Sequence, residues 1–487
     1  MKPMSNLILS STLATAFLLT GNVNAQDAEK EPENAPVESK APEVVSEEKV
    51  DAEVKTSPES KLERSPSEVV AIPPKKLEIE PLKKKIDVAD KPQMKVEVVN
   101  EDTIIYSPNA EVRLRQNIRV LGNTSHDLTS RARVGLKGKY KALSLNVQVQ
   151  DARLLGFSGV SDGGITGIHE GYLQLDNETF MFRAGRQEIN LGGQRMIGSL
   201  NWADSARAFD SLRLQVKMNN FKVDLFGAVL SPQDSGVDTN STPFDSHGDY
   251  LGGAYFTYTP MKTIAIEPYI LFRHHGPNSR NVKNKHNIAS FGLRSWGDFD
   301  GGLGYEVEGD LQVGKRNGND HLAYAFAGHV YYVIDNPMKP KIEIGGSFAT
   351  GESSDGKTNE FDNFFPTNHK FYGSADLFGW RNIIQGDLSV AAHPSKTIDA
   401  KLMVAPTLLA DKDGRWSNAG GKTIGAPSGE DVFLGTEIDF SAKWKPEKHF
   451  FFSGGYSLFL PGKAAEERLG SDDAIHYLYL MSGVKFN

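Results

Sequence analysis

Arginines recur at alternate positions early in the chain. Arg113 and Arg115 alternate with apolar residues in one stretch, and Arg131 and Arg133 do the same in the next. Guanidinium groups stay charged and offer paired donors that match a carboxylate or a phosphate. Side chains at alternate positions of a strand share one face. The spacing therefore predicts a row of anion-binding groups along one side of a β-sheet.

We expect further charged side chains to lie on the same polar face as this row. The basic set is Arg113, Arg115, Arg119, Arg131, Arg133, Arg183, Arg186, Arg213, Arg273 and Arg381, and the acidic set is Glu306, Glu308 and Asp310. Basic and acidic groups occur in different strands, which predicts stripes of opposite charge. The alternative is that arginines and acids pair across strands and only stiffen the sheet.

The elements that position these residues are strands, because apolar and polar residues alternate through residues 101–487. Eight short polar turns fall near 140–142, 176–179, 217–220, 259–262, 297–301, 334–339, 392–396 and 444–448. Nine longer loops fall near 121–127, 153–166, 187–206, 231–248, 274–286, 314–320, 351–376, 411–430 and 460–474. The two kinds alternate along the chain and delimit eighteen strands. Short turns at one end and long loops at the other are typical of an outer-membrane β-barrel.

Whether the charged face points to lipid or to the lumen follows from the free-energy cost of placing arginine in lipid. An arginine facing lipid at mid-bilayer costs about 2–4 kcal/mol, and a whole domain is stable by only about 5–15 kcal/mol. The apolar face must therefore meet lipid and the arginine face must line the lumen. We predict an all-β fold, an 18-stranded antiparallel transmembrane β-barrel. A soluble sandwich or propeller is the alternative, but no repeat of propeller length recurs.

The chain divides into three zones of different composition. Residues 1–25 have a basic start, an apolar stretch and a small-residue cleavage pattern, which predicts a signal peptide that is removed. Residues 26–100 are rich in Pro, Glu and Lys and hold no Gly and no aromatic residue, which predicts a disordered periplasmic linker. Residues 101–487 form the barrel. The linker is either a solvated spacer or an arm that contacts peptidoglycan or a periplasmic scaffold protein.

Two blocks of residues resemble the hallmark of the alginate export family. The first runs from Arg183 to Arg213 and includes Arg183-Ala-Gly-Arg-Gln-Glu188, Gly192-Gly-Gln-Arg-Met-Ile-Gly198 and Asn201-Trp202. The second is Phe364-Phe-Pro-Thr-Asn-His-Lys-Phe-Tyr-Gly373. The resemblance covers about residues 103–487 and implies an 18-stranded outer-membrane barrel with an electropositive lumen. It also implies a functional set of Arg186, Gln187, Glu188, Gln194, Arg195, Trp202, Arg207, Asp210 and His369.

We assign expected positions to this set. Arg186, Gln187, Glu188, Gln194 and Arg195 are expected to fold inward and line a constriction. Arg207 and Asp210 are expected to pair where the chain re-enters the wall, and His369 to lie in a long outer loop that acts as a lid. Loop anchoring alone is the alternative for both blocks.

Other chemistry is weakly supported. Gly351-Glu-Ser-Ser-Asp-Gly-Lys-Thr358 matches the phosphate-loop pattern, but no helix pattern follows it, so we expect a polar outer loop. The histidines are scattered along the chain. We therefore expect no metal centre, no catalytic residue and no enzymatic activity. No cofactor is expected; Ca²⁺ bound by loop acids is a minor alternative, with candidate ligands Asp234, Asp238, Asp355, Asp411, Asp413, Asp472 and Asp473.

The leading functional hypothesis is a passive outer-membrane channel for an anionic polysaccharide such as an alginate-like polyuronate, or for a small anionic solute. A general diffusion porin and an envelope-tethering barrel are the alternatives. Expected partners are outer-membrane lipid, lipopolysaccharide and the anionic solute. No nucleic acid is expected, because the chain carries 54 basic and 62 acidic residues.

Overall fold

The computed structural model describes residues 103–155, 165–230, 249–275, 286–352, 359–427 and 429–486. The predicted signal peptide (1–25) and linker (26–100) lie outside the described residues, as do most of the phosphate-loop-like segment and the candidate Ca²⁺ ligands Asp234, Asp238 and Asp355. None of the described helices is long and apolar enough to cross a membrane.

Eighteen strands and two short helices make up the described chain. The first nine strands are β1 (Ile105–Leu121), β2 (Asn123–Tyr140), β3 (Leu143–Leu155), β4 (Ile165–Asp176), β5 (Phe180–Gln187), β6 (Phe209–Met218), β7 (Phe221–Leu230), β8 (Asp249–Met261) and β9 (Ile264–His275). The next are β10 (His286–Asp298), β11 (Leu303–Arg316), β12 (Asn319–Val333), β13 (Lys341–Ala349), β14 (Ile383–Ser395), β15 (Ile398–Leu408), β16 (Phe433–Trp444), β17 (Phe450–Pro461) and β18 (Ile475–Phe486). The helices are η1 (Asn368–Lys370) and α1 (Lys463–Leu469).

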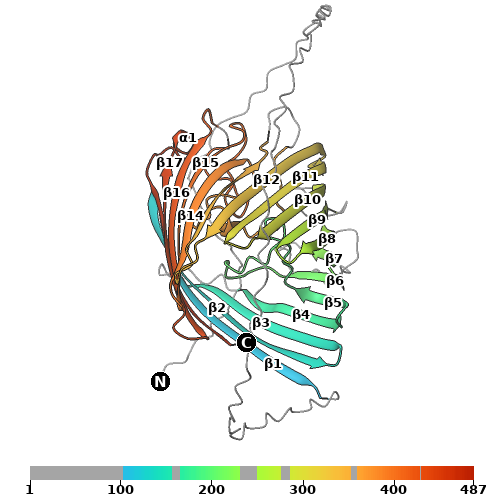
Figure 1. The fold of residues 1–487 in the computed structure, drawn as a ribbon. Coiled ribbons are helices and arrows are strands. Elements are labelled where there is room, and N and C mark those ends of the chain that lie inside the picture. Colours follow the sequence, from blue (N-terminus) through green and yellow to red (C-terminus); the bar gives the residue numbers. More distant parts are fainter. Residues whose placement is uncertain are drawn as a thin grey trace, which may run out of the picture. The chain divides into compact units, whose positions relative to one another are not determined.

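The strands form one closed antiparallel barrel, as the sequence predicts (Figure 1). Each strand pairs with its neighbours in sequence, and β1 pairs with β18, with Ala110 opposite Phe486. Closure removes the free strand edges that would otherwise expose unpaired backbone groups to lipid. Both described ends of the barrel lie at the end where the connections are short.

Period-two alternation decides which side chains face lipid. In β3, Leu145 and Val147 are 52% and 41% exposed, whereas Ser144 and Asn146 are 1% and 5% exposed. The same pattern holds on β1, where Leu114 is exposed and Arg113 and Arg115 are buried. The apolar face therefore lies outside and the polar face lines the lumen, which is the arrangement of a membrane barrel.

Two loops predicted to be long are tight turns. Gly122 alone, with φ 65°, joins β1 to β2, and Asn317 and Gly318, with φ 54° and 89°, join β11 to β12. An Asn-Gly pair suits the two-residue hairpin turn that needs positive φ at both positions. The polar residues that flank these turns are part of the paired strands. Pairing between strands satisfies their backbone N–H and C=O groups, so polar composition does not prevent strand formation there.

Three long connections fold into the lumen, where they form a buried core. We name them inner loop 1 (188–208, after β5), inner loop 2 (described residues 350–352 and 359–382, after β13) and inner loop 3 (described residues 409–427 and 429–432, after β15). Trp380 and Trp416 from inner loops 2 and 3 are at most 1% exposed, and Phe378 packs between Trp416 and the wall residue Phe459. The apolar core of this protein thus lies inside the barrel, where side chains of the inner loops pack against lumen-facing side chains of the wall.

Candidate functional site

The arginine cluster of β1 and β2 lies where inner loop 1 meets the lumen wall. Arg113 and Arg131 are direct neighbours in register, and with Arg115 and Arg133 they are all less than 9% exposed. Four like charges brought together out of water need counter-charges. Asp204 of inner loop 1 supplies one, since its carboxylate accepts hydrogen bonds from Arg113 Nη2 at 2.5 Å and from Arg115 Nη2 at 2.7 Å.

Backbone carbonyls of inner loop 1 take further donors of the same cluster. Arg113 Nη1 donates to the Asn201 carbonyl at 2.8 Å and Arg115 Nη1 to the Trp202 carbonyl at 2.9 Å. Arg131 pairs with Glu111 of the wall and donates to the Asn201 carbonyl at 3.1 Å. The donors of the arginine cluster are therefore occupied by the Asp204 carboxylate and by backbone carbonyls of inner loop 1.

Trp202 connects this cluster to inner loop 2. Its ring stacks on His369 with centroids 3.8 Å apart and planes 9° apart, and the Arg115 guanidinium lies 4.5 Å from its centroid. His369 Nδ1 lies 2.9 Å from Asp376. The stack places His369 inside the barrel, so the prediction that it lies in an outer lid loop is wrong.

Inner loops 1 and 2 are joined by backbone hydrogen bonds. Ile197 and Phe365 form a parallel bridge, and the Thr367 amide donates to the Gln194 carbonyl at 2.9 Å. Arg207 Nη1 donates to the carbonyls of Gly198 and Phe365 at 2.8 and 2.5 Å. Burial, and then the charge of Arg273, lower the pKa of Arg207 to about 10, which leaves the side chain charged at neutral pH.

Two predictions on these residues are wrong. Arg207 does not pair with Asp210, because it turns inward to the loop carbonyls. Asp210 instead pairs with Arg186 at 2.9 Å. Arg186 shares its strand face with the 41%-exposed Phe182, and Asp210 shares its face with the 58%-exposed Leu212. The pair therefore lies on the outer face of the wall near the long-loop end, and Arg186 does not line the lumen.

Inner loop 2 is anchored to the wall by two buried acids. Asp362 pairs with Arg273 of β9 at 3.0 Å and with Arg381 of its own loop. Glu360 pairs with Arg316 at 3.0 Å and with Arg415 at 2.7 Å. Burial opposes ionisation of Asp362, but the charges of Arg381 and Arg273 outweigh it and lower its pKa well below the ordinary range.

The acidic stripe lies on β11, and Glu306, Glu308 and Asp310 all face the lumen as predicted. Arg294 of β10 pairs with Glu306 at 3.0 Å, and Tyr269 donates to Glu308 at 2.9 Å. Arg195 of inner loop 1 lies 3.8 Å from Glu308 and packs its guanidinium over the Phe371 ring at 3.9 Å. The stripe is a network of acids, arginines and hydroxyl groups that contacts inner loop 1 through Arg195.

The remaining predicted residues have mostly local partners. Arg183 donates to Gln174, Arg213 pairs with Asp224, Arg119 donates to the Ala375 carbonyl, Gln187 donates to the Ser211 carbonyl, Glu188 pairs with His169, and Gln194 accepts from Thr367. Arg381 lies in inner loop 2 rather than on a strand. Most predicted residues are thus inside the barrel, in contacts with the wall or between loops.

Three acids that meet these arginines, Asp204, Glu360 and Asp362, are not among the residues predicted from the sequence. Asp204 lies within the first family block, between Trp202 and Arg207, so its position in that block was a signal. No sequence signal pointed to Glu360 and Asp362, because they adjoin the phosphate-loop-like segment, which we expected to be an outer loop.

One group of potential metal ligands occurs among the described residues. Donor atoms of His329, Glu343 and Asp387 lie within 4.8 Å of one another. Positively charged side chains already contact this group, since Arg195 Nη2 is 3.4 Å from His329 Nδ1 and Lys341 Nζ is 2.5 Å from Glu343. These contacts make the group part of the wall network.

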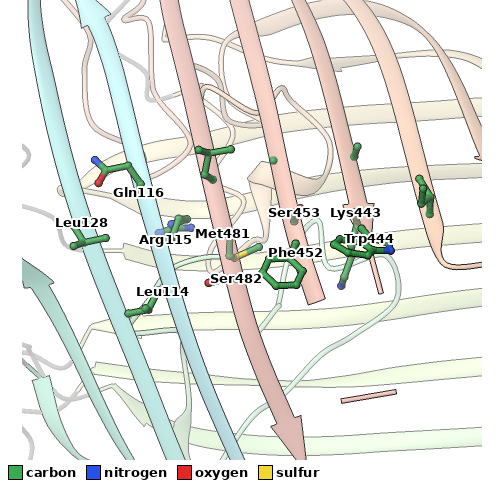
Figure 2. A pocket seen from close by; sticks show the side chains of 14 residues that line it. Leu114, Arg115, Gln116, Leu128, Lys443, Trp444, Phe452, Ser453, Met481 and Ser482 are labelled. Carbon is green, nitrogen blue, oxygen red and sulfur yellow. The ribbon is translucent and has the colours of Figure 1, made fainter. Parts of the chain in front are cut away.

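A shallow hollow of about 670 Å³ lies along β1 and β15–β18 (Figure 2). Most of its lining side chains, including Leu114, Phe452 and Trp444, belong to the lipid-facing side of their strands. Small residues such as Gly454 and Ser482 create the depression between these larger side chains. The hollow therefore lies mainly on the membrane-facing surface, away from the inner loops.

A closed 18-stranded barrel with an apolar exterior and a polar lumen defines the class of outer-membrane channels. A model of the alginate export family matches residues 108–477. The chain belongs to the alginate export family, and it is an outer-membrane channel for solutes.

Solved structures with a similar fold come from Pseudomonas aeruginosa. OccK5 (OpdH) matches with a TM-score of 0.56 and 10% identity, over 80% of this chain and 99% of that chain. OpdL matches with a TM-score of 0.57 and 9% identity, over 78% and 98%. OccK2 (OpdF), solved in complex with glucuronate, matches with a TM-score of 0.55 and 10% identity, over 78% and 98%. No curated protein matches the sequence.

Proposed function

We propose that this channel passes an anionic polysaccharide of the alginate-like polyuronate type, or a related anionic solute, along its arginine-lined wall. The observation that carries the proposal is the carboxylate of Asp204, held at 2.5 and 2.7 Å by Arg113 and Arg115. Those two guanidinium groups bind a carboxylate inside the lumen, and a uronate presents the same group. The uronate therefore competes with Asp204 for the arginines.

Family membership and the fold support this choice of solute. The alginate export family is described by the transport of a polyuronate. OccK2, which shares the fold, was solved with glucuronate, a monomeric uronate. A lumen lined by ionised side chains selects permeant ions by charge.

Passage requires the inner loops to move. Inner loop 1 covers the arginine cluster, and inner loops 2 and 3 add the buried side chains of Trp380 and Trp416 inside the barrel. In the conformation described, the arginines bind the protein's own carboxylate. We infer that the solute enters when inner loop 1 releases the cluster, so that the lumen is closed at rest and opens as the uronate replaces Asp204.

Single-channel recording in a planar bilayer under a salt gradient tests the proposal. We expect anion selectivity, and concentration-dependent block by oligomers of mannuronate and guluronate. Neutral oligosaccharides of equal length are the matched control and should not block. A large, unselective and unblocked conductance would instead indicate a general diffusion porin. A protein that never conducts, with or without uronate, would contradict the channel mechanism.

A further inference from the structure

Three lysines on the lumen side of β15, β16 and β18 lie apart from the arginine cluster and have no acidic partner among the described residues. Lys401, Lys443 and Lys485 share strand faces with the buried residues Met403, Asp439 and Tyr479 respectively, which places them inside the barrel. None of the three forms an ion pair with a described residue. Each is at least partly exposed. An ammonium group that is hydrated and unpaired remains available to a passing anion.

Acids that lie opposite these lysines are already engaged by other cations. Asp399 faces Lys443 in register, but its two oxygens bind Lys445 at 2.9 Å and His393 at 2.8 Å. Glu111 faces Lys485 in register, but it pairs with Arg131. The acids in register with Lys443 and Lys485 are therefore paired with other cations, and the cross-strand partners of Lys401 are the uncharged residues Ala391 and Ser441.

An aromatic ring lies between the lysines. Phe451 of β17 is opposite Gly483, and a Cβ atom at residue 483 would come within 2.5 Å of the ring. The glycine thus lets the ring lie close against the lumen wall. Lys443 Nζ is 4.9 Å from the ring centroid. Figure 2 shows Lys443 of β16, Ser453 of β17, Met481 of β18 and Arg115 of β1, which pair in register in that order across the neighbouring strands.

These groups lie near the short-turn end of the barrel. Lys443 immediately precedes Trp444, the last residue of β16, and Lys485 is next to the last residue of β18. Short turns of outer-membrane barrels are at the periplasmic side. A solute that enters from the periplasm therefore meets the lysines before it reaches Arg115, further along the row.

We propose that Lys401, Lys443, Lys485 and Phe451 form an entry subsite for one carboxylated sugar residue of the polymer. The ammonium groups bind the carboxylate, and the apolar face of the ring packs against the C–H side of the sugar. This inference rests on the proposed function, since it assumes an anionic sugar polymer. It adds a second binding position that is free while the arginine cluster is covered.

Sided block of single channels by hexaglucuronate tests the subsite. In the triple variant Lys401→Gln, Lys443→Gln, Lys485→Gln, we expect the rate of block from the short-turn side to fall about tenfold in 0.1 M salt, because local charge steers ions. Block from the long-loop side should be unchanged. The matched control removes three lysines from short turns, Lys262→Gln, Lys339→Gln and Lys448→Gln. An equal loss in the control, or none in the triple variant, overturns the proposal.

The ring is tested separately with Phe451→Leu. The residence time of hexaglucuronate in the blocked channel should shorten severalfold. The residence time of hexaglutamate, which carries carboxylates but no sugar rings, should not change. Equal effects on both probes would refute the sugar-ring contact.

Equilibrium binding of labelled hexaglucuronate to the full-length protein in detergent separates this subsite from the channel function. If wild-type protein binds the probe and the triple variant does not, the subsite stands even where no current flows. If the two bind equally, the subsite is wrong whatever the conductance.

Discussion

Asp204 is the acidic residue that binds inner loop 1 to Arg113 and Arg115. Its carboxylate receives two charge-assisted hydrogen bonds from arginines that belong to β1, 91 and 89 positions earlier in the chain. Hydrogen bonds to charged groups contribute about 1.5–3 kcal/mol each when little water competes. The Asp204 carboxylate is therefore a main contact of inner loop 1 with the arginine cluster, beside the carbonyls of Asn201 and Trp202.

We predict that Asp204→Asn weakens the docking of inner loop 1 by about 1.5–3 kcal/mol, which raises the undocked population about tenfold or more. Unitary openings at low salt should become more frequent and more anion-selective. Asp210→Asn is the matched control, because Asp210 also pairs with an arginine but on the outer face. Equal open probability in Asp204→Asn and wild-type channels would refute the idea that this contact closes the lumen.

Glycines opposite aromatic residues make room for rings on the lumen wall. Gly292 is the cross-strand partner of Tyr269, and an added Cβ would lie 2.0 Å from that ring. Tyr269 cannot move aside cheaply, since it is 2% exposed and donates to Glu308 at 2.9 Å.

We expect Gly292→Ala to destabilise the barrel by about 1–3 kcal/mol through overpacking. Gly227→Ala is the control, because no atom lies within 4 Å of a Cβ there, and it should be neutral or stabilising by up to about 1 kcal/mol. Urea unfolding in lipid vesicles, followed by tryptophan fluorescence, measures both. Similar midpoints for the two variants would contradict the steric argument.

At the scale of elements, inner loop 2 is held by ion pairs rather than by strand pairing. Glu360 and Asp362 are fully buried, and between them they bind four arginines from the wall and from inner loops 2 and 3. Burial raises the pKa of Glu360, but the hydrogen bond and charge of Arg415 outweigh it and the net pKa is lowered. The loop is therefore docked by ionised carboxylates.

The sign of the pH dependence follows from these lowered pKa values. Both acids stabilise docking fully above their ordinary pKa values of 3.8 and 4.5, and this contribution is lost as the pH falls toward the lower values of the folded state. We predict an unchanged closed probability from pH 8 to pH 5 and increased opening at pH 3, measured by single-channel recording. Opening that begins already at pH 6 would show that another group controls the loop.

A variant isolates the same anchor at neutral pH. Asp362→Asn leaves Arg273 and Arg381 without their buried partner, which typically costs about 3–5 kcal/mol, so inner loop 2 should become sensitive to limited proteolysis. Asp413→Asn removes a carboxylate from an exposed pair with Lys412 and should leave the cleavage rate unchanged. Equal cleavage rates for the two variants would refute the anchor.

On the scale of the whole molecule, the barrel and its inner loops are two layers joined by contacts distant in sequence. The loops are also joined to each other, since Thr367 Oγ1 donates to Gln194 Oε1 at 2.9 Å across 173 positions. If the lumen opens as proposed, by release of inner loop 1 alone, contacts between the loops break together with contacts to the wall.

A reversible cross-link tests this requirement. The chain has no cysteine, so Gln194→Cys with Thr367→Cys introduces one defined pair. We predict that the oxidised double variant conducts less than wild type even with uronate present, and that a reducing agent restores the current. Each single variant serves as a control. Full conductance by completely cross-linked protein would mean that inner loops 1 and 2 move as one unit.

The sequence by itself determined the wall of this protein. Lipid and water act on each residue separately, so alternation such as Leu145 against Asn146 indicates the strand, its two faces and, with the turns, the number of strands. One connection in the wall differs from its prediction. The polar composition of residues 314–320 predicts a long loop, but Asn317 and Gly318 form a tight hairpin turn, because their backbone conformation decides the connection.

Only the tertiary structure decided what fills the lumen. Long connections can extend into solvent or fold into the barrel, and period-two alternation of apolar and polar residues does not predict which of the two occurs. The fold brings Asp204 to Arg113 and Asp362 to Arg273 across about ninety positions, and no local pattern encodes such pairings. The loops fold inward because their apolar residues, among them Trp380 and Trp416, can leave water only inside the barrel, where the wall arginines supply partners for their acids and carbonyls.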